Sequence, residues 1–427
     1  MKYKGLVPIN DTRFNRTSLT CEGESYTGTK REQCYIQEEG VLYAPRYWAQ
    51  CNGYGVKSVF PKVVWPKFQG TYRAGQKEAI DETVKGLKQS NSGLLEAFTG
   101  AGKTLLGLSI AARLGTKALI VCNKTDLLDQ WCESGHDFFG LTCGHLQGDV
   151  KRMGNHFTVA TVQTLYSRID DIKYWNKFGL VIFDESHHVP AKSFTSIISR
   201  MPARYRLGVS ATFVRTDGME DVWKWHLGEK LHVMEGKALA GYYHQPTLSF
   251  PLNDRSYTKY GKIQHSALLT AIADIDNYNM DIAADAKELV KSGRKIIVVS
   301  ERVSQLESIA KYLKSGYGFY CGKANGKVIS KDQLEKTKTK KIILATRGKI
   351  GEGSDLPSFD TLWLASPMTS VIQVVGRITR QHKGKKIPLV IDPIFNTPYN
   401  NALAAKRRKF YKELNLKKIN PSDILEV

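Results

Sequence analysis

Short apolar runs that alternate with longer amphipathic segments constrain the fold of this chain more than any other feature. From about residue 93, apolar runs occupy residues 94–95, 118–121, 158–160, 180–183 and 207–209. Buried parallel strands have continuous apolar sequences of this kind, and helical crossovers connect them. The alternation therefore predicts an α/β domain built on a parallel sheet.

The same alternation occurs a second time. It weakens over residues 237–260, then resumes with one long expected helix at 267–289 and with apolar runs at 296–299, 342–345, 362–364 and 388–391. Before residue 68, short alternating runs and scattered prolines indicate a small β-rich element instead. We therefore expect a β-rich domain at 1–67, α/β domains at 68–240 and 241–405, and a basic tail at 406–427.

The chain carries a large excess of positive charge. Its 62 Lys and Arg residues outnumber 41 Asp and Glu residues, which gives a formal net charge of +21. This excess favours a polyanionic partner, because each Lys or Arg set against a phosphate releases condensed counterions. Two basic runs, 336–341 and 406–409, could add such affinity, although solvated faces would explain both runs equally well.

Membrane and secreted classes do not fit the sequence. No run approaches the roughly 20 apolar residues of a bilayer span, and the first residues lack the apolar core of a secretory signal. The 7 cysteines are odd in number and contain no C-x-x-C pair, which argues against a secreted disulfide framework. We expect a cytoplasmic protein with reduced thiols.

Residues 97–104 have the composition and context of a Walker A loop, because they follow an apolar strand and open a helical run. Its glycines would turn backbone N–H groups onto phosphates at the helix N-terminus. Lys103 would reach the β- and γ-phosphates and Thr104 would ligate Mg²⁺. Ala97 departs from the usual Gly, and a chance glycine-rich turn is the alternative. The expected nucleotide-binding residues here are Ala97, Phe98, Thr99, Gly100, Ala101, Gly102, Lys103 and Thr104.

An acidic pair, Asp184-Glu185, follows the apolar run 180–183. A strand that ends in two carboxylates presents them at the carboxyl edge of a parallel sheet, where ligands of such folds bind. Asp184 would hold Mg²⁺, largely through water, and Glu185 would orient and deprotonate the attacking water. Alone, such a pair is a common solvated surface feature; after a Walker A loop it becomes a Walker B element. His188 is expected to be structural.

These motifs resemble those of the superfamily-2 helicases. Asp184-Glu185-Ser186-His187 resembles the DEAH-type motif II, with Ser in place of Ala. Arg73-Ala74-Gly75-Gln76 is similar to the R-x-x-Q element, which implies adenine contacts for Arg73 and Gln76. Ser210-Ala211-Thr212 resembles motif III, which would couple the ATP site to the nucleic-acid grip. Arg215 follows in a setting common to the XPB-like branch.

The resemblance continues in the second α/β domain and spans roughly residues 70–395. Residues 299–301 are similar to motif IV, and Thr346 with 351–357 resembles motif V, which adds Gly353 and Asp355 to the nucleotide-binding residues. Residues 373–380 fit the motif VI pattern Q-x-x-G-R-x-x-R. Here Gln373, Arg377 and Arg380 would share one helix face. The resemblance implies that these three catalytic residues meet the γ-phosphate; two arginines solvating a helix is the alternative.

Within the superfamily, the chain resembles most the branch that includes XPB-like proteins and UvsW. The resemblance implies two tandem RecA-like parallel-sheet domains, ATP and Mg²⁺ as cofactors, and remodelling of forks, Holliday junctions and displacement loops. Branched DNA would be bound without sequence specificity. The nucleic-acid contacts implied are Asn123, Lys124, Thr161, Ser300 and Thr346. We expect a monomer in a bacterial or phage-infected cell, with replication or recombination proteins as candidate partners.

Other classes stay open. An RNA helicase has the same motor motifs, and residues 1–67 could be either a duplex-binding module or a structural cap. A non-enzymatic nucleic-acid clamp would need a decayed ATP site, but Lys103, Glu185 and Arg380 are all in place. A nuclease-linked translocase would need a separate carboxylate cluster for two metal ions, and the sequence has no such cluster.

Overall fold

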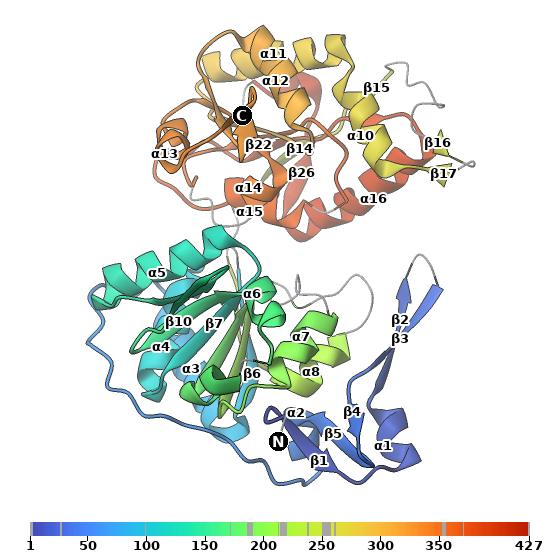
Figure 1. Ribbon diagram of the computed structural model, residues 1–427. Coiled ribbons are helices and arrows are strands. Elements are labelled where there is room, and N and C mark those ends of the chain that lie inside the picture. Colours follow the sequence, from blue (N-terminus) through green and yellow to red (C-terminus); the bar gives the residue numbers. More distant parts are fainter. Residues whose placement is uncertain are drawn as a thin grey trace. The chain divides into compact units, whose positions relative to one another are not determined.

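The computed structural model describes most of the chain. The described residues are 3–25, 28–98, 100–170, 172–185, 191–211, 213, 220–236, 239–249, 258–259, 262–351, 356–369 and 371–425. They form two compact units, Met1–Gly236 and Lys237–Val427. Each unit is described by itself (Figure 1).

The N-terminal residues of unit 1 are β-rich, as expected. A three-stranded antiparallel sheet has the order β1-β5-β4, and a separate hairpin pairs β2 with β3. Leu19, Leu42 and Trp48 belong to a small core of this segment. The segment is bound to the rest of the unit, since Arg46 Nη1 donates to the Ala203 carbonyl at 2.6 Å. Its elements are β1 (Leu6–Ile9), α1 (Arg13–Ser18), β2 (Thr20–Ser25), β3 (Gly28–Gln33), β4 (Ile36–Glu38), β5 (Val41–Pro45) and α2 (Arg46–Cys51).

The main sheet of unit 1 has eight strands among the described residues, in the order β13-β6-β12-β11-β7-β10-β8-β9. The apolar runs of the first α/β domain all form strands of this sheet, and these strands pair in parallel. Their carboxyl ends therefore share one edge. The strands are β6 (Ser92–Ala97), β7 (Ala118–Cys122), β8 (Gly144–Gln147), β9 (Val150–Arg152), β10 (Phe157–Thr161), β11 (Leu180–Asp184), β12 (Tyr205–Ser210) and β13 (Lys230–Met234).

Helices cover both faces of this sheet, because its central strands are apolar on both sides. Along β11, Ile182 packs into the core under α3, α4 and α5, whereas Val181 and Phe183 pack into the core with α7 and α8. This alternation is the period of two that a strand requires. The helices are α3 (Gln76–Ser90), α4 (Lys103–Leu114), α5 (Thr125–Phe139), α6 (Val162–Ser167), α7 (Ala191–Ile198) and α8 (Glu220–Leu227), with a 3₁₀ turn at Ile172–Lys177.

Unit 2 contains a second parallel sheet, of seven strands among the described residues, in the order β19-β22-β18-β23-β24-β14-β26. The apolar runs predicted for this half form its centre. The strands are β14 (Gly241–His244), β18 (Ile296–Ser300), β19 (Tyr317–Tyr320), β22 (Ile342–Thr346), β23 (Thr361–Leu364), β24 (Leu389–Ile391) and β26 (Leu416–Lys418). Two-stranded pairs join β15 (Thr247–Leu248) to β25 (Ile394–Phe395), β16 (Thr258–Lys259) to β17 (Lys262–Ile263) and β20 (Lys323–Ala324) to β21 (Lys327–Val328).

Two apolar cores also flank this second sheet. Along β18, Ile296 and Val298 pack with α10, α11 and α12, while Ile297 and Val299 pack with α14, α15 and α16. Among the described residues of both units, no helix is long and apolar enough to cross a bilayer. The helices are α10 (His265–Ala273), α11 (Asp276–Lys291), α12 (Val303–Leu313), α13 (Lys331–Lys338), α14 (Arg347–Gly351), α15 (Ile372–Ile378) and α16 (Pro398–Glu413), with a 3₁₀ turn at Pro421–Asp423.

The single long helix expected at 267–289 is wrong. The chain forms two helices there, because α10 ends at Ala273 and α11 begins at Asp276. The side-chain nitrogen Nδ2 of Asn279 donates to the Ala273 carbonyl at 2.8 Å. It satisfies a carbonyl at the end of α10 that a continuous helix would have bonded internally.

The basic tail expected at 406–427 is an integral part of unit 2 instead. Helix α16 runs through its first half and β26 joins the sheet beside β14. Arg407 is 2% exposed, and its Nε donates to Asp392 Oδ2 at 2.8 Å. A buried guanidinium needs such a partner, so Arg407 cannot serve a solvent-borne ligand. Of the run 406–409, Lys406 and Lys409 are exposed, Arg408 is partly buried and Arg407 is buried.

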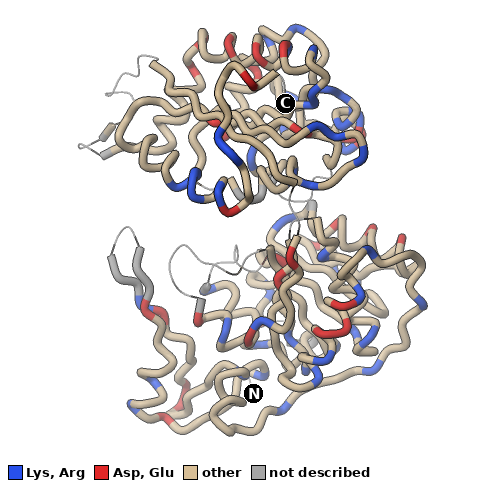
Figure 2. The backbone as a smooth tube through the Cα atoms, turned by 180° about the vertical axis from the view of Figure 1, so that it is seen from behind, with Lys and Arg blue, Asp and Glu red and all other residues tan. Residues whose placement is uncertain are grey.

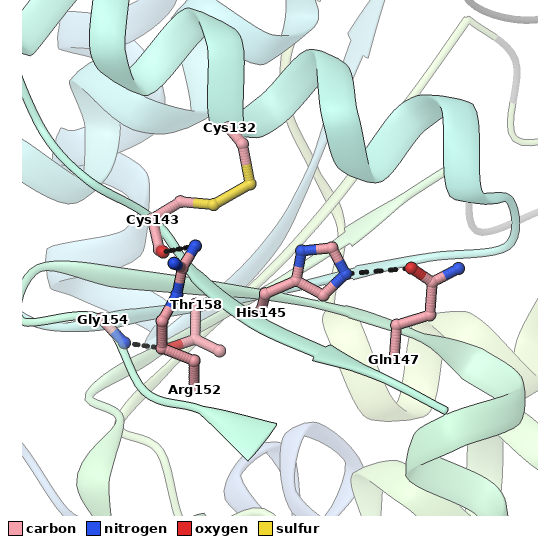
Figure 3. Close-up of a disulfide and its surroundings, with 7 residues drawn as sticks. All are labelled: Cys132, Cys143, His145, Gln147, Arg152, Gly154 and Thr158. Atoms are coloured by element: carbon pink, nitrogen blue, oxygen red, sulfur yellow. Dashed lines mark hydrogen bonds between the residues drawn. A yellow bond between two sulfur atoms is a disulfide. The ribbon is translucent and has the colours of Figure 1, made fainter. Parts of the chain in front are cut away.

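The expectation of reduced thiols is wrong for one pair. Cys132 on α5 and Cys143, just before β8, form a disulfide with their Cα atoms 5.3 Å apart (Figure 3). The chain reverses direction between them at Gly140, which has φ of 63°. The bond therefore ties the last half of α5 to the start of β8. Among the described residues, Cys21, Cys34, Cys51, Cys122 and Cys321 are free thiols.

Candidate active site

The glycine-rich loop lies between β6, which ends at Ala97, and α4, which begins at Lys103. Gly100 and Gly102 have φ of 100° and 82°, a left-handed conformation that favours glycine. The turn leaves the first N–H groups of α4 at the loop, where a helix N-terminus attracts anions. Ala97 is buried, Phe98 is exposed, and Thr99 lies outside the described residues.

The two R-x-x-Q residues, Arg73 and Gln76, contact backbone carbonyls of this loop. Gln76 is 2% exposed; its Nε2 donates to the Ala101 carbonyl at 2.7 Å, and its Oε1 accepts from the Arg73 N–H at 2.8 Å. A Cβ atom at Gly102 would lie 2.7 Å from Gln76 Nε2. Gln76 therefore fixes the loop's conformation and also requires glycine at position 102. Arg73 is exposed, with Nη1 3.4 Å from the Gly100 carbonyl.

Lys103 and Glu185 form an ion pair at the carboxyl edge of the sheet. Lys103 Nζ donates to Glu185 Oε1, and the two side chains are only 14% and 11% exposed. The second Glu185 oxygen, Oε2, accepts from the Ser210 hydroxyl at 3.2 Å. One chain of contacts thus links the phosphate loop, the acidic pair and the end of β12. Glu185 has φ of 48°, a strained position for a residue other than glycine.

Asp184 is the last residue of β11 and is 4% exposed. Its Oδ2 accepts a hydrogen bond from the indole N–H of Trp131 at 2.8 Å. Its Oδ1 is buried and has no hydrogen-bond partner in the described part of the chain. Burial, and then the charge of Glu185, raise the pKa of Asp184 to about 6.

This arrangement suits a divalent cation that a nucleotide brings with it. The buried oxygen Asp184 Oδ1 needs a partner, and Thr104, at the start of α4, supplies a hydroxyl of the type that binds Mg²⁺. The described residues contain no group of three or more His, Cys, Asp or Glu side chains that could hold a metal alone. A cation here would therefore complete its shell with phosphate and water oxygens.

Replacing Asp184 by asparagine is expected to stabilise the nucleotide-free protein while removing hydrolysis. Because the folded state raises the pKa from 3.8 to about 6, ionising Asp184 costs stability, and this cost appears as the pH rises through that range. At neutral pH the gain should be about 1–3 kcal/mol. Asparagine can still accept the Trp131 hydrogen bond. Thermal and urea unfolding of both proteins across pH would measure this gain in stability. A gain that does not shrink as the pH falls towards about 4 would contradict this account.

Three of the residues expected to contact nucleic acid come together in unit 1. Asn123, Lys124 and Thr161 line an open pocket of about 500 Å³ at the ends of β7 and β10, together with Thr125, Gln147 and Gln163. Thr161 is 5% exposed, and its Oγ1 caps α6 by accepting from the Thr164 N–H at 3.4 Å. The Thr161 hydroxyl therefore supports the wall of the pocket and is barely accessible to a ligand. Gln147 belongs to no motif, so sequence reasoning missed it.

The two corresponding residues of unit 2 differ from each other. Ser300 is fully buried; its hydroxyl donates to Gln305 Oε1 at 2.6 Å and accepts from the Arg302 N–H at 3.0 Å. Both hydrogen bonds hold the hydroxyl inside the protein just before α12, where it cannot reach a ligand in solvent, which argues against the expected contact. Thr346 ends β22 at the carboxyl edge and is partly exposed. It retains the position that the prediction requires.

The motif VI residues do not all share one helix. Gln373 and Arg377 lie on α15, but the helix ends at Ile378 and Arg380 follows the C-cap Thr379. Arg377 is 7% exposed, whereas Arg380 is more accessible and its carbonyl accepts from Lys385 Nζ at 3.0 Å. The expectation that all three residues lie on one helix is therefore wrong, because Arg380 lies beyond the end of α15. Gly353, Asp355, Ser186, His187, His188, Thr212 and Arg215 lie outside the described residues.

Comparisons with known proteins agree with these motifs. Residues 69–215 match the family described as "Type III restriction enzyme, res subunit". The "Putative ATP-dependent RNA helicase L396" of Acanthamoeba polyphaga mimivirus is 28% identical over 378 residues, covering 84% of this chain and 71% of that protein. The "DNA 3'-5' translocase XPB2" of Sulfurisphaera tokodaii is 32% identical over 162 residues, covering 38% of this chain and 36% of that protein.

A solved structure shares the fold. The "ATP-dependent Type ISP restriction-modification enzyme LlaBIII bound to DNA" aligns with a TM-score of 0.59 at 14% identity, over 82% of this chain and 30% of that chain. The two parallel sheets, the first of which carries the phosphate loop and the acidic pair at its carboxyl edge, have the fold of two RecA-like domains. These likenesses support an ATP-hydrolysing nucleic-acid helicase of superfamily 2 that is related to the XPB-like proteins, as the sequence predicted.

Proposed function

We propose that this helicase is a DNA translocase that remodels branched DNA, such as forks, Holliday junctions and displacement loops. The observation that carries the motor part is the contact chain from Lys103 through Glu185 to Ser210, because it joins the ATP site to motif III. DNA is the preferred substrate because the XPB2 relative is named a DNA translocase. The mimivirus relative is named an RNA helicase, so RNA is the second candidate.

ATP binding would rearrange the Lys103–Glu185 pair. The β- and γ-phosphates carry more negative charge than one carboxylate, so Lys103 would turn to them and release Glu185 Oε1. Ser210 would keep Oε2 in place, and Oε1 could then orient the attacking water. Thr104 and Asp184 would hold Mg²⁺, whose charge stabilises the transferring phosphoryl group.

The second unit would complete this site. We infer that Arg380, with Arg377 and Gln373, contacts the γ-phosphate when the two units close around ATP. Arg380 is the more accessible of the two arginines and follows directly on α15. Since ATP would then contact both units, ATP binding would favour the closed arrangement, and ATP hydrolysis would let the units separate. DNA held by both units would be gripped at changing spacing.

The nucleic acid would enter along the open pocket of unit 1. Its lining of amide, hydroxyl and Lys124 groups is suited to phosphate oxygens and offers no apolar platform for stacked bases. Such contacts read the backbone rather than the sequence, which is what a translocase for many junctions needs.

One comparative experiment tests this proposal. ATP hydrolysis and strand separation should be measured with single-stranded DNA, forks, four-way junctions and RNA duplexes, with Glu185→Gln as the inactive control. We expect stimulation by DNA and the greatest remodelling on forks and junctions. Activity with RNA and none with DNA would replace the proposed substrate. If no nucleic acid supports ATP hydrolysis, the proposal of an ATP-driven motor is wrong.

Lysines at the amino edge of the second sheet, opposite the edge where its strands end, are expected to add affinity for DNA without sequence specificity. Lys340 and Lys341 line a pocket of about 460 Å³ with Lys287 and Lys291 of α11. Lys and Arg residues occur along the backbone of both units (Figure 2). Each lysine that contacts a phosphate contributes about 0.9 to the slope of log affinity against log salt.

The measurement is that slope for a DNA duplex. Neutralising Lys340 and Lys341 to glutamine should reduce the slope by up to about 2, whereas the same change at Lys323 and Lys327, exposed on the β20–β21 hairpin, should not. Equal slopes for both variants would mean that the pocket lysines are solvated and contact no DNA.

A further inference from the structure

Helix α5 brings a tryptophan to the acidic pair of the ATP site. Trp131 is fully buried, and its indole N–H donates to Asp184 Oδ2 at 2.8 Å. This hydrogen bond from α5 to the end of β11 engages one of the two carboxylate oxygens of Asp184. The other oxygen, Oδ1, is left without a partner among the described residues.

The neighbouring helix α4 is shaped to let this indole pass. A Cβ atom at Gly107 would lie 2.5 Å from Trp131 Cη2 and 3.1 Å from Cζ3. A Cβ contact of 2.5 Å is shorter than real structures show, so any larger residue at 107 would force the indole ring or its surroundings to shift. Gly107 has no phosphate to contact: it is buried in the middle of α4, well past the loop.

The helix that carries the indole is held in place as well. The next residue, Cys132, is bonded to Cys143, which ties α5 to the start of β8 (Figure 3). The ring itself packs in the core beneath α4, α5 and β11, with Leu106, Leu128 and Ile182. A side chain enclosed this way has one orientation, so its N–H points at a fixed place.

We propose that Trp131 is a positioning residue for the metal-binding carboxylate, and that Gly107 is its steric requirement. By occupying Oδ2, the indole holds the Asp184 carboxylate in the one rotation that presents Oδ1 to Mg²⁺. The inference rests on the proposed role of Asp184 in holding Mg²⁺. Partners behind a metal ligand of this kind typically change metal affinity 10- to 100-fold when they are removed.

The test is the effect of Mg²⁺ on ADP affinity, measured by fluorescence with a labelled ADP, and direct binding of Mn²⁺ to the ADP complex by electron paramagnetic resonance. Trp131→Phe keeps a packed ring but removes the N–H. We expect the variant to need roughly 10- to 100-fold more Mg²⁺ or Mn²⁺, with unchanged affinity for ADP in the absence of metal. Gly107→Ala should change metal affinity in the same direction.

The matched control is Trp175→Phe. Trp175 is also buried in unit 1, at 4% exposure, and its indole nitrogen has no hydrogen-bond partner in the described chain. This variant should bind metal and ADP as the unaltered protein does. A metal affinity of Trp131→Phe within about twofold of the control, in a protein that melts normally, would overturn the inference. So would an equal loss of ADP affinity without metal, since that indicates a general packing defect.

Asp184→Asn separates this inference from the proposed function. If Mg²⁺ strengthens ADP binding and Asp184→Asn abolishes that effect, the metal site stands, and Trp131→Phe alone decides the positioning role. If Asp184→Asn leaves the Mg²⁺ effect intact, the proposed site itself is wrong.

Discussion

Replacing Arg380 by alanine is expected to reduce ATP hydrolysis by a factor of about 10³ to 10⁵ while ATP still binds. An arginine on the γ-phosphate stabilises the charge that develops in phosphoryl transfer, whereas the phosphate loop supplies most of the ground-state binding. Because Arg380 follows the end of α15 and is more accessible than Arg377, it is the better candidate for this contact. Phosphate release and labelled-ATP binding, measured on the same sample, would separate the two steps.

Two controls sharpen this experiment. Lys383→Ala removes a positive charge from an exposed position nearby and should leave hydrolysis unchanged. Arg380→Lys keeps the charge but loses the planar donor fork, so it should recover little of the rate. Loss of ATP binding with a normal rate per bound ATP would refute the role of Arg380 in the reaction.

Replacing Lys103 by alanine is expected to abolish ATP turnover, a loss of at least about 10³-fold. The change also leaves Glu185 nearly buried without its cation, so the free energy of unfolding should fall by about 1–3 kcal/mol. Adding Glu185→Gln to this variant should restore much of the stability and none of the activity, because it removes the unpaired charge. Hydrolysis assays and thermal unfolding give both readouts. Ordinary hydrolysis by Lys103→Ala would contradict the site.

The sheets and the ATP-site motifs could be predicted because their signals are local. A continuous apolar run marks a parallel strand whichever way the rest of the chain folds, and β7 and β18 lie where those runs do. The loop at 97–104 and the pair Asp184-Glu185 were placed by the strand before each of them. The strands pair in parallel, so residues that directly follow them in the sequence lie together at the carboxyl edge of the sheet.

The contacts behind the site could not be predicted, since they join residues distant in the chain. Nothing around Trp131 indicates that its indole meets Asp184, and Gln76 reveals its bond to the Ala101 carbonyl only once α3 packs beside the loop. The same limit explains Ser300: the end of a strand was predicted, but not the side on which its hydroxyl would be enclosed. The disulfide also depends on how the chain turns between α5 and β8, which cysteine spacing does not reveal.

The pairing of β14 with β26 decides how this motor can be divided into halves. β14 is an early element of unit 2 and β26 a late one, yet they are neighbours at one end of the sheet. A fragment that starts after β14 loses the strand that joins β26 to β24 and so uncovers a row of unpaired backbone groups, which invites self-association. Anyone expressing the second half alone should therefore cut before residue 241 and keep the chain through residue 418.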